Sequence, residues 1–473
     1  MKCFELVPQV HTVAKSCRTI YRSRIVILME ETMSRKKTDV RLFTRREALK
    51  LTAGGAAGFL AGCAVNPVTG EQQLMLISRE QEIALDKKQS PHQFSADYGP
   101  VQDSTVNNYV SSVGNSLART THRPDMPYSF RCVNANYVNA YAFPGGSIAC
   151  TRGILLKLDN EAELAALLGH ELGHVNARHT ASRVSSSMAT QGLLSIGVGV
   201  IATQSSELAP LAAGLGGVGA GLLLASYSRD DERQADSLGM EYMDNADYDP
   251  QGMVGLMDML NGLHESDPSF VQQMFASHPM SSERYETAVT EARTTYGGKK
   301  GKLLRERYMD NIASIRKDEP AIKEMQDGEG AMKKKAFADA QTHFAKALDY
   351  APNDYAGLLL MAKCKMARNQ QEEGLRYAEK ARRIYPQEPQ AMHLAGMLQL
   401  EEGRYRSALR NFQSYEKNLP GNPSTIFFSG YAYEALGNRE MAANHYYRYL
   451  QATREGDAAK HAYSRLDAWG YIK

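Results

Sequence analysis

The sequence predicts a mainly helical α+β chain, in which a helical domain with a small β-sheet precedes an array of helical repeats. Three observations carry this prediction: an amphipathic helix with two histidines, a strand ending in a Pro-Gly-Gly turn, and a 34-residue period near the C-terminus. The chain has 473 residues, too many for one ordinary compact domain. Its formal net charge of +2 gives no strong basic field, so a nucleic-acid partner is not expected.

The first 62 residues are interpreted as an export signal that is absent from the mature protein. Basic residues precede an apolar run over residues 51–62, which is too short to span a bilayer stably. A buried Gly/Ala-rich helix is the alternative. Residues 1–32 fit poorly before such a signal, whereas translation from Met33 would give a compact basic region.

The apolar run ends in Leu60-Ala61-Gly62-Cys63, which resembles the bacterial lipobox, whose cysteine is lipidated and becomes the mature N-terminus. Residues 44–50 resemble a twin-arginine export motif, with Ala48 in place of the usual Phe; a general secretory signal is the alternative. Ala64, rather than Asp, follows the cysteine. The resemblance to bacterial lipoproteins therefore implies a periplasmic chain with a lipid anchor at Cys63 in the outer membrane.

The six cysteines include no Cys-x-x-Cys pair, so their spacing predicts neither a structural zinc site nor a redox motif. In an oxidising periplasm Cys132 and Cys150 have two interpretations, a disulfide or two buried free thiols. Both stay open, because the sequence gives no distance between them.

A capped, mostly buried helix is predicted around a histidine motif. Asn160 and Glu163 resemble a capping box, and apolar residues recur at helical spacing: Leu164, Leu167, Leu168, Leu172 and Val175. His170 and His174 lie one turn apart, so their imidazoles can meet on one zinc ion. Glu171 sits beside the first histidine, where it can take a proton from a water on the metal. Two satisfied core histidines are the alternative.

The third zinc ligand is expected from another segment, and His179 is interpreted as a polar residue near the helix end. Glu232 and Asp236 are four residues apart, so they lie on one helix face. Asp230 and Asp231 compete with them, because any carboxylate can bind zinc. An exposed, charged helix start is the alternative interpretation.

These motifs occur together with two others, Asn139–Gly146 and Ser277-His278-Pro279. The set resembles the metallopeptidase family that includes the CAAX prenyl proteases and the bacterial heat-shock membrane protease, and in particular a periplasmic branch with C-terminal repeats. The likeness covers roughly residues 63–473. It implies a gluzincin domain with one zinc per chain, in which Glu232 is the third ligand and Asp236 orients a histidine ligand.

The resemblance implies roles for further residues. An extended peptide would pair with the backbone of an edge strand made of Asn139, Ala140, Tyr141 and Ala142. Pro144-Gly145-Gly146 is by itself a turn signal that would end such a strand. An ordinary hairpin is the alternative for this stretch, and it is compatible with a peptide-binding role. His278 and Arg284 resemble a catalytic pair near the zinc that steadies the developing oxyanion. In the periplasmic branch this histidine can instead fill the open zinc position, although a loop histidine before proline is more often structural.

An apolar stretch separates the two ligand segments. Residues 208–225 form an uncharged run of 18 residues, which is long enough for a membrane span. Pro210 and several glycines weaken that interpretation. We favour flexible helices or a loop that covers the site or touches a partner.

The C-terminal region is predicted to be an α-solenoid of tetratricopeptide repeats. Pro352, Pro386 and Pro420 are 34 residues apart, the period of that helix-turn-helix repeat. About four units fit, and their concave surface would bind peptides or partner proteins. An unrelated helical bundle is the alternative, but it would not place a proline at the same position of successive 34-residue units.

Residues 63–320 are therefore assigned to a zinc metallopeptidase domain and residues 321–473 to the repeats. The resemblance implies an endopeptidase that cleaves misfolded or misassembled envelope proteins, with the outer-membrane assembly machinery as the partner of the repeats. A chaperone or assembly adaptor with a mostly silent zinc site is the competing interpretation. A purely structural zinc is disfavoured, because three protein ligands leave one position open.

Overall fold

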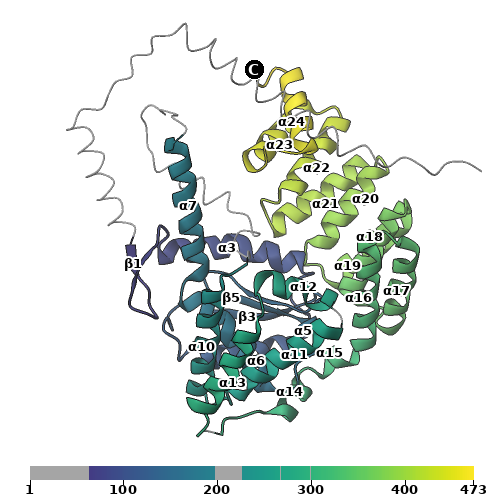
Figure 1. Ribbon diagram of the computed structural model, residues 1–473. Helices are drawn as coiled ribbons and strands as arrows, with labels where there is room; N and C mark the ends of the chain where they lie inside the picture. Colours follow the sequence, from purple (N-terminus) through teal and green to yellow (C-terminus); the bar gives the residue numbers. More distant parts are fainter. Residues whose placement is uncertain (1–62, 198–225, 267, 299, 473) are drawn as a thin grey trace, which may run out of the picture. The chain divides into compact units, whose positions relative to one another are not determined.

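The computed structural model describes residues 63–197, 226–266, 268–298 and 300–472 (Figure 1). Cys63–Lys473 forms one compact unit. The export signal predicted in residues 1–62 and the apolar run over 208–225 lie outside the described residues. Within the described part of the chain, no helix is both long enough and apolar enough to cross a bilayer.

A three-stranded sheet lies at the centre of the first part of the chain. Its strands are β3 (Ser129–Val133), β4 (Ala140–Ala142) and β5 (Ser147–Thr151), in the order β3-β5-β4. β5 runs parallel to β3 and antiparallel to β4, so β4 is an edge strand, as the fold prediction requires. Gly146 closes the β4–β5 turn with a φ of 101° and donates its N–H to the carbonyl of Phe143 at 3.0 Å. A separate ribbon pairs β1 (Cys63–Val65) with β2 (Gln72–Leu74).

Two cysteines face each other in this sheet. Cys132 on β3 lies directly opposite Cys150 on β5. Both are buried free thiols, which is the second of the two interpretations that the sequence left open. Burial raises the pKa of the Cys132 thiol well above its usual range, so the thiol stays protonated and unreactive.

Helices cover both faces of the sheet. The helices of this part of the chain are α3 (Arg79–Ala96), α4 (Ser104–Ala118), α5 (Arg152–Leu155), α6 (Glu161–Asn176), α7 (His179–Gly197), α10 (Arg229–Asn245), α11 (Gln251–Ser266), α12 (Pro268–Ser277), α13 (Ser282–Thr294), α14 (Arg305–Asn311) and α15 (Ala313–Lys317). α3 lies on one face, where Phe94 packs with Tyr141 and Phe143 (Figure 1). α4 and α6 lie on the other face, against side chains such as Ile148. Alternate residues of β4 therefore enter two different cores.

The histidine motif lies on α6, and every residue of this helix is buried. Asn160 caps it as predicted, accepting the Glu163 N–H at 3.1 Å. The Glu163 carboxylate does not complete the predicted capping box, because it accepts the N–H of Asp159 at 2.7 Å and the Asn160 side-chain amide at 2.8 Å. The helix start is held by three hydrogen bonds in place of the two of a capping box.

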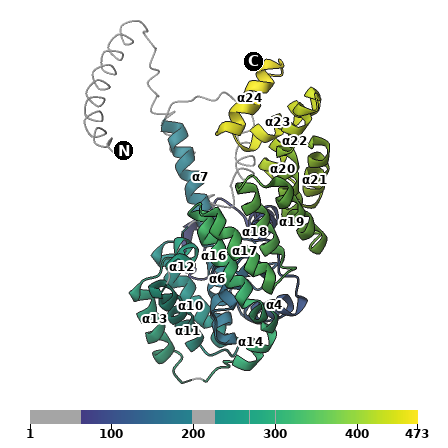
Figure 2. The same ribbon diagram turned by 90° about the vertical axis from the view of Figure 1, so that its right-hand side faces the viewer.

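The helices after α15 form a stacked array of pairs (Figure 2). They are α16 (Glu319–Lys333), α17 (Phe337–Tyr350), α18 (Tyr355–Ala367), α19 (Gln371–Ile384), α20 (Gln390–Glu401), α21 (Tyr405–Asn418), α22 (Pro423–Ala435), α23 (Arg439–Ala452) and α24 (Asp457–Ala468). A Cβ on Gly328 would lie 2.4 Å from Phe344, and two periods later one on Gly396 would lie 2.4 Å from Phe412. This recurring close contact confirms the repeat array. The domain boundary at residue 320 stays a prediction.

A buried ion pair joins the sheet to the repeats. Arg152 follows β5, and its guanidinium binds Asp354, which caps α18 by accepting the Gly357 N–H at 2.7 Å. The side chains of Arg152 and Asp354 are only 5% and 7% exposed. Neither charge can be rehydrated if its partner is removed.

We expect Asp354→Ala to lower the free energy of unfolding by about 3 kcal/mol, because it leaves the Arg152 charge buried without its partner. Chemical denaturation of the full chain measures this difference. Asp349→Ala, which removes an exposed carboxylate from α17, is the matched control and should have little effect. Equal unfolding midpoints for the two variants would contradict the structural role of this ion pair.

Candidate metal centre

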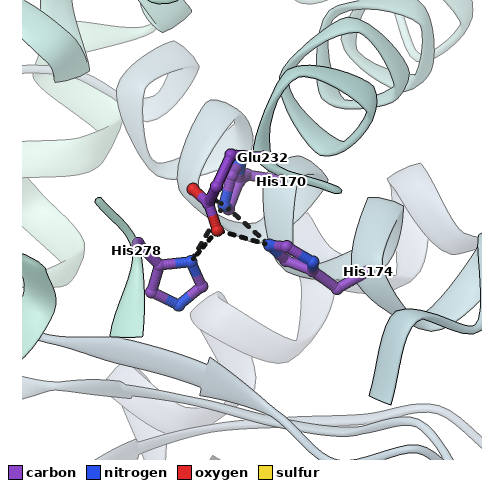
Figure 3. A group of neighbouring side chains, drawn as sticks. All are labelled: His170, His174, Glu232 and His278. Atoms are coloured by element: carbon purple, nitrogen blue, oxygen red, sulfur yellow. Dashed lines mark hydrogen bonds and ion pairs between the residues drawn. The ribbon is translucent and has the colours of Figure 1, made fainter. Parts of the chain in front are cut away.

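Four buried side chains converge on one point between α6, α10 and the segment after α12. His170 and His174 come from α6, Glu232 from the first turn of α10, and His278 from the residue after α12 (Figure 3). One ligand atom from each lies within 4.8 Å of all the others. The chain segments that supply these groups are far apart in the sequence, so the site depends on the tertiary fold.

The distances within this cluster match a tetrahedral zinc site. His170 Nε2 is 3.1 Å from His174 Nε2 and 3.2 Å from His278 Nδ1. Two nitrogens bound to one zinc at about 2.05 Å and a tetrahedral angle lie about 3.3 Å apart. Glu232 Oε1 is 3.1 Å from His278 Nδ1 and 3.4 Å from His174 Nε2. The donor types and their spacing therefore fit zinc.

Close packing of α6 on α10 sets these distances. A Cβ on Gly173 would lie 2.8 Å from the Cα of Ala235, and one on Gly169 would lie 3.1 Å from the carbonyl oxygen of Gly239. Small residues one turn apart on both helices allow the backbones to approach closely. Glu232 and Asp236 consequently reach the two histidines of α6.

Asp236 orients His170. Its Oδ1 is 2.8 Å from His170 Nδ1, which leaves Nε2 of that ring directed at the cluster. Arg284 holds Asp236 through two hydrogen bonds of 2.7 and 2.8 Å, and its Nη1 lies 2.6 Å from Glu232. Asp236 is buried, which favours the neutral acid, but Arg284 and His170 outweigh this effect and lower its pKa.

His179 supports the second histidine, a role that the sequence did not indicate. Its Nδ1 is 2.9 Å from Nδ1 of His174, and its Nε2 is 2.9 Å from Gln234 Oε1. The helix is interrupted between α6 and α7 at Arg178, whose φ is 60°. This break turns His179 back onto the ring that a continuous helix would have kept it from reaching.

The two competing aspartates lie away from the cluster. Asp231 forms the capping box of α10 with Ser228, accepting its N–H at 3.0 Å. Asp230 is exposed and pairs with Arg233. Glu232 is the buried carboxylate of this helix start. Burial by itself would raise its pKa, but His278, His174 and His170 outweigh burial and lower that pKa well below its usual range.

Glu171 is positioned beside the cluster without joining it. Its side chain is fully buried, and neither oxygen makes a hydrogen bond with the described residues. The nearest basic atom is His278 Nε2, 3.6 Å from Glu171 Oε1. Burial raises the pKa of this carboxyl. A buried carboxylate without donors is costly, so its place fits a group that holds a water at the metal.

A cavity of about 230 Å³ lies between the edge strand and the metal cluster. Asn139, Tyr141 and Ala142 line one side, and His278 lines the other. Asn139 Oδ1 is buried there without a hydrogen-bond partner among the described residues. Tyr227, which the sequence did not single out, also lines the cavity and stacks on His174 with ring centroids 3.7 Å apart.

The free edge of β4 borders this cavity. The carbonyl of Asn139 accepts from Thr151 N at 3.0 Å, and Phe143 N donates to Ser147 at 2.8 Å. Bonding to β5 alternates along an antiparallel strand, so the backbone groups of Ala140 and Ala142 point away from β5. They are available to an added chain.

The family model described as "Peptidase family M48" matches residues 104–292, a segment that includes the sheet, α6, α10 and His278. Residues 104–292 are thus similar to peptidase family M48. The M48 segment thus contains all four residues of the metal cluster and Glu171.

Two curated relatives each match part of the chain. The beta-barrel assembly-enhancing protease of Yersinia pestis is 29% identical over 241 residues, 50% of this chain and 49% of that protein. Metalloprotease YcaL of Escherichia coli (strain K12) is 32% identical over 178 residues, 37% of this chain and 64% of that protein. The chain thus spans about half the length of the first relative. The crystal structure of PilW, a type IV pilus biogenesis factor, aligns at 18% identity with a TM-score of 0.30, covering 48% of this chain and 96% of PilW.

We expect Gly173→Ala to weaken zinc binding by about tenfold, because the added methyl group must push α10 away from α6 and move Glu232. Competition with a chelator measures the affinity. Gly330→Ala on α16 is the matched control, since open space surrounds that glycine. Zinc affinity that is equal in the two variants would refute the role of this helix contact.

Proposed function

We propose that this M48 chain is a zinc-dependent endopeptidase that cleaves protein substrates. The observation that carries the proposal is the buried Glu171 carboxylate, which has no hydrogen-bond partner among the described residues and lies beside four converging metal-binding groups. A structural zinc site needs no such carboxylate. A hydrolase needs one to take a proton from the attacking water.

The side chains of the site would have separate roles, in metal binding and in proton transfer. His170, His174 and Glu232 would hold the zinc, and burial keeps His174 in the neutral form that binds metal by lowering its pKa well below the usual range. Zinc, when bound, supplies a Lewis acid that polarises a carbonyl and acidifies water. Glu171 would accept the proton of that water and pass it to the leaving amine.

Peptide binding would use the edge strand. The free backbone groups of Ala140 and Ala142 can pair with an extended substrate, and Asn139 offers a further acceptor. The described lining of the adjoining cavity carries no acidic or lysine side chain. Backbone pairing beside a cavity that has no acidic or lysine side chain in its described lining favours broad selectivity for extended, unfolded segments.

The guanidinium of Arg284 is bound to groups of the protein and is not directed at a position where an oxyanion would form. Its guanidinium already binds Asp236, Glu232 and the carbonyl of Pro279 at 2.8 Å. We propose that it holds these two carboxylates in position, and that His278 is the group that can stabilise the developing oxyanion. Burial opposes a charge on His278, but Glu232 and Glu171 outweigh it and raise the pKa of its ring.

We place this activity in the periplasm, in quality control and assembly of outer-membrane proteins. The similarity to a beta-barrel assembly-enhancing protease and the lipobox ending at Cys63 support this placement. Lipidation of Cys63 would anchor the chain to the outer membrane. The repeats would bind components of the assembly machinery, since stacked helix pairs offer an extended surface for proteins.

We expect Glu171→Gln to lower the rate of cleavage of an unfolded protein by about a hundredfold or more while zinc stays bound, because the amide cannot accept the proton. Turnover assays with zinc content by atomic absorption test this. Glu286→Gln on α13 changes an exposed glutamate and is the control. If Glu171→Gln keeps full envelope function in cells, the chaperone or adaptor role is the main one.

We expect His278→Ala to retain one zinc per chain and to cleave faster than the unaltered chain, because opening the metal site outweighs the loss of a group that can steady the oxyanion. Four protein ligands complete a tetrahedral site, so losing one opens a position for water. The measurement is the initial rate on the same substrate, with autolysis as a second readout. A slower variant with full zinc content would show that His278 acts only as a catalytic helper.

A further inference from the structure

We propose that α16, the first repeat helix, positions the peptide-binding strand β4 by holding Asn136, which makes Gln326 and Glu329 positioning residues. The role of β4 in binding peptide rests on the proposed function. The contact between α16 and the segment before β4 does not.

Asn136 lies in the segment that joins β3 to β4, three residues before the peptide-binding stretch begins, and it is fully buried. Gln326 donates its side-chain amide to the backbone carbonyl of Asn136 at 2.6 Å. Asn136 donates its own amide to Glu329 at 3.1 Å. One helix of the repeats therefore binds both the backbone and the side chain of this residue.

The remaining acceptor of Asn136 leads to the repeats by a second path. Its Oδ1 accepts from Nε and Nη2 of Arg152 at 3.0 and 2.7 Å. Arg152 follows β5 and is bound in turn by Asp354, the cap of α18. The start of the β4–β5 hairpin and its end are thus both tied to repeat helices.

The fit around Asn136 leaves little room for another position. A Cβ on Gly153 would lie 2.1 Å from the carbonyl oxygen of Asn136. Tyr137 and Tyr141 each donate a 2.6 Å hydrogen bond to Asp97, which fixes the strand on its α3 side. A displacement of α16 would therefore be transmitted to β4 rather than absorbed in the loop.

β4 depends on such support. It has three residues and pairs with β5 alone, so few sheet hydrogen bonds hold it. Gln326, Glu329 and Asp354 lie outside residues 104–292, the segment that the M48 model matches. The repeats thus contribute to the peptide-binding edge of the M48 domain. A partner that shifts α16 would change peptide affinity, and peptide would change affinity for that partner equally.

The test compares Gln326→Ala and Glu329→Ala in the full, zinc-loaded chain, using casein as the unfolded substrate. We expect KM to rise about fivefold or more in each, as the loss of one partly buried hydrogen bond predicts, with kcat within about twofold. Zinc content should not change. Glu329→Gln keeps an acceptor for Asn136 and should restore KM. Lys323→Ala, an exposed position on α16, is the control.

Hydrogen exchange provides a readout that needs no activity. Backbone amides of residues 138–143 should exchange faster in the two alanine variants than in the unaltered chain or in Lys323→Ala. Unchanged exchange and unchanged KM would overturn the proposal. A fall in kcat or zinc content with unchanged KM would also overturn it, because the variants would then act on the metal centre. Faster exchange in a chain that cleaves nothing would support α16 and refute the proposed peptidase.

Discussion

The close contact between α6 and α10 is the constraint on which the metal centre depends. Zinc ligands must lie within a few tenths of an ångström of their required positions, and Glu232 reaches His170 and His174 only when the two helix backbones nearly touch. Gly173 against Ala235 and Gly169 against Gly239 give that approach, because no side chain separates the backbones. The glycine inside the histidine motif therefore contributes to metal affinity through packing, although it carries no chemistry.

This packing places several charges in one buried volume, so the charges must balance one another. Arg284 lies between Asp236 and Glu232, and both carboxylates also face histidine rings. Removing any one of these groups would leave an uncompensated charge away from water. Glu171 is the exception, since none of the described groups donates to it. The ligands are thus enclosed by hydrogen bonds and ion pairs, whereas the carboxylate that is proposed to accept a proton has none among the described residues.

Local patterns in the sequence predicted much of this site. The helical spacing of His170 and His174 follows from one helix, and the 34-residue period follows from repeated helix pairs, so both were visible without a structure. The choice of Glu232 over Asp230 and Asp231 came only from the family resemblance, because local spacing does not show which side of α10 faces α6. His179 lies outside the four clustered metal-binding groups, as predicted, but its contact with His174 was missed, because that contact depends on the positive φ of Arg178, which the sequence does not indicate. Tyr227 and Asn136 were missed for another reason, because their partners are distant in the sequence.

The edge strand β4 has to meet two opposing requirements, and contacts from the rest of the fold allow it to meet both. A strand that accepts peptides must keep one edge unpaired, and an unpaired edge also makes the strand less stable and prone to unwanted pairing. In this chain the strand is short, its two ends are held by Asn136 and the Gly146 turn, and Asp97 anchors Tyr141 from one face. Contacts at both ends of the strand and on one of its faces therefore hold it in place, while its outer edge stays unpaired. Some of those contacts come from the repeats. The surface that would recognise partners and the strand that would bind substrates are therefore connected by direct hydrogen bonds and an ion pair.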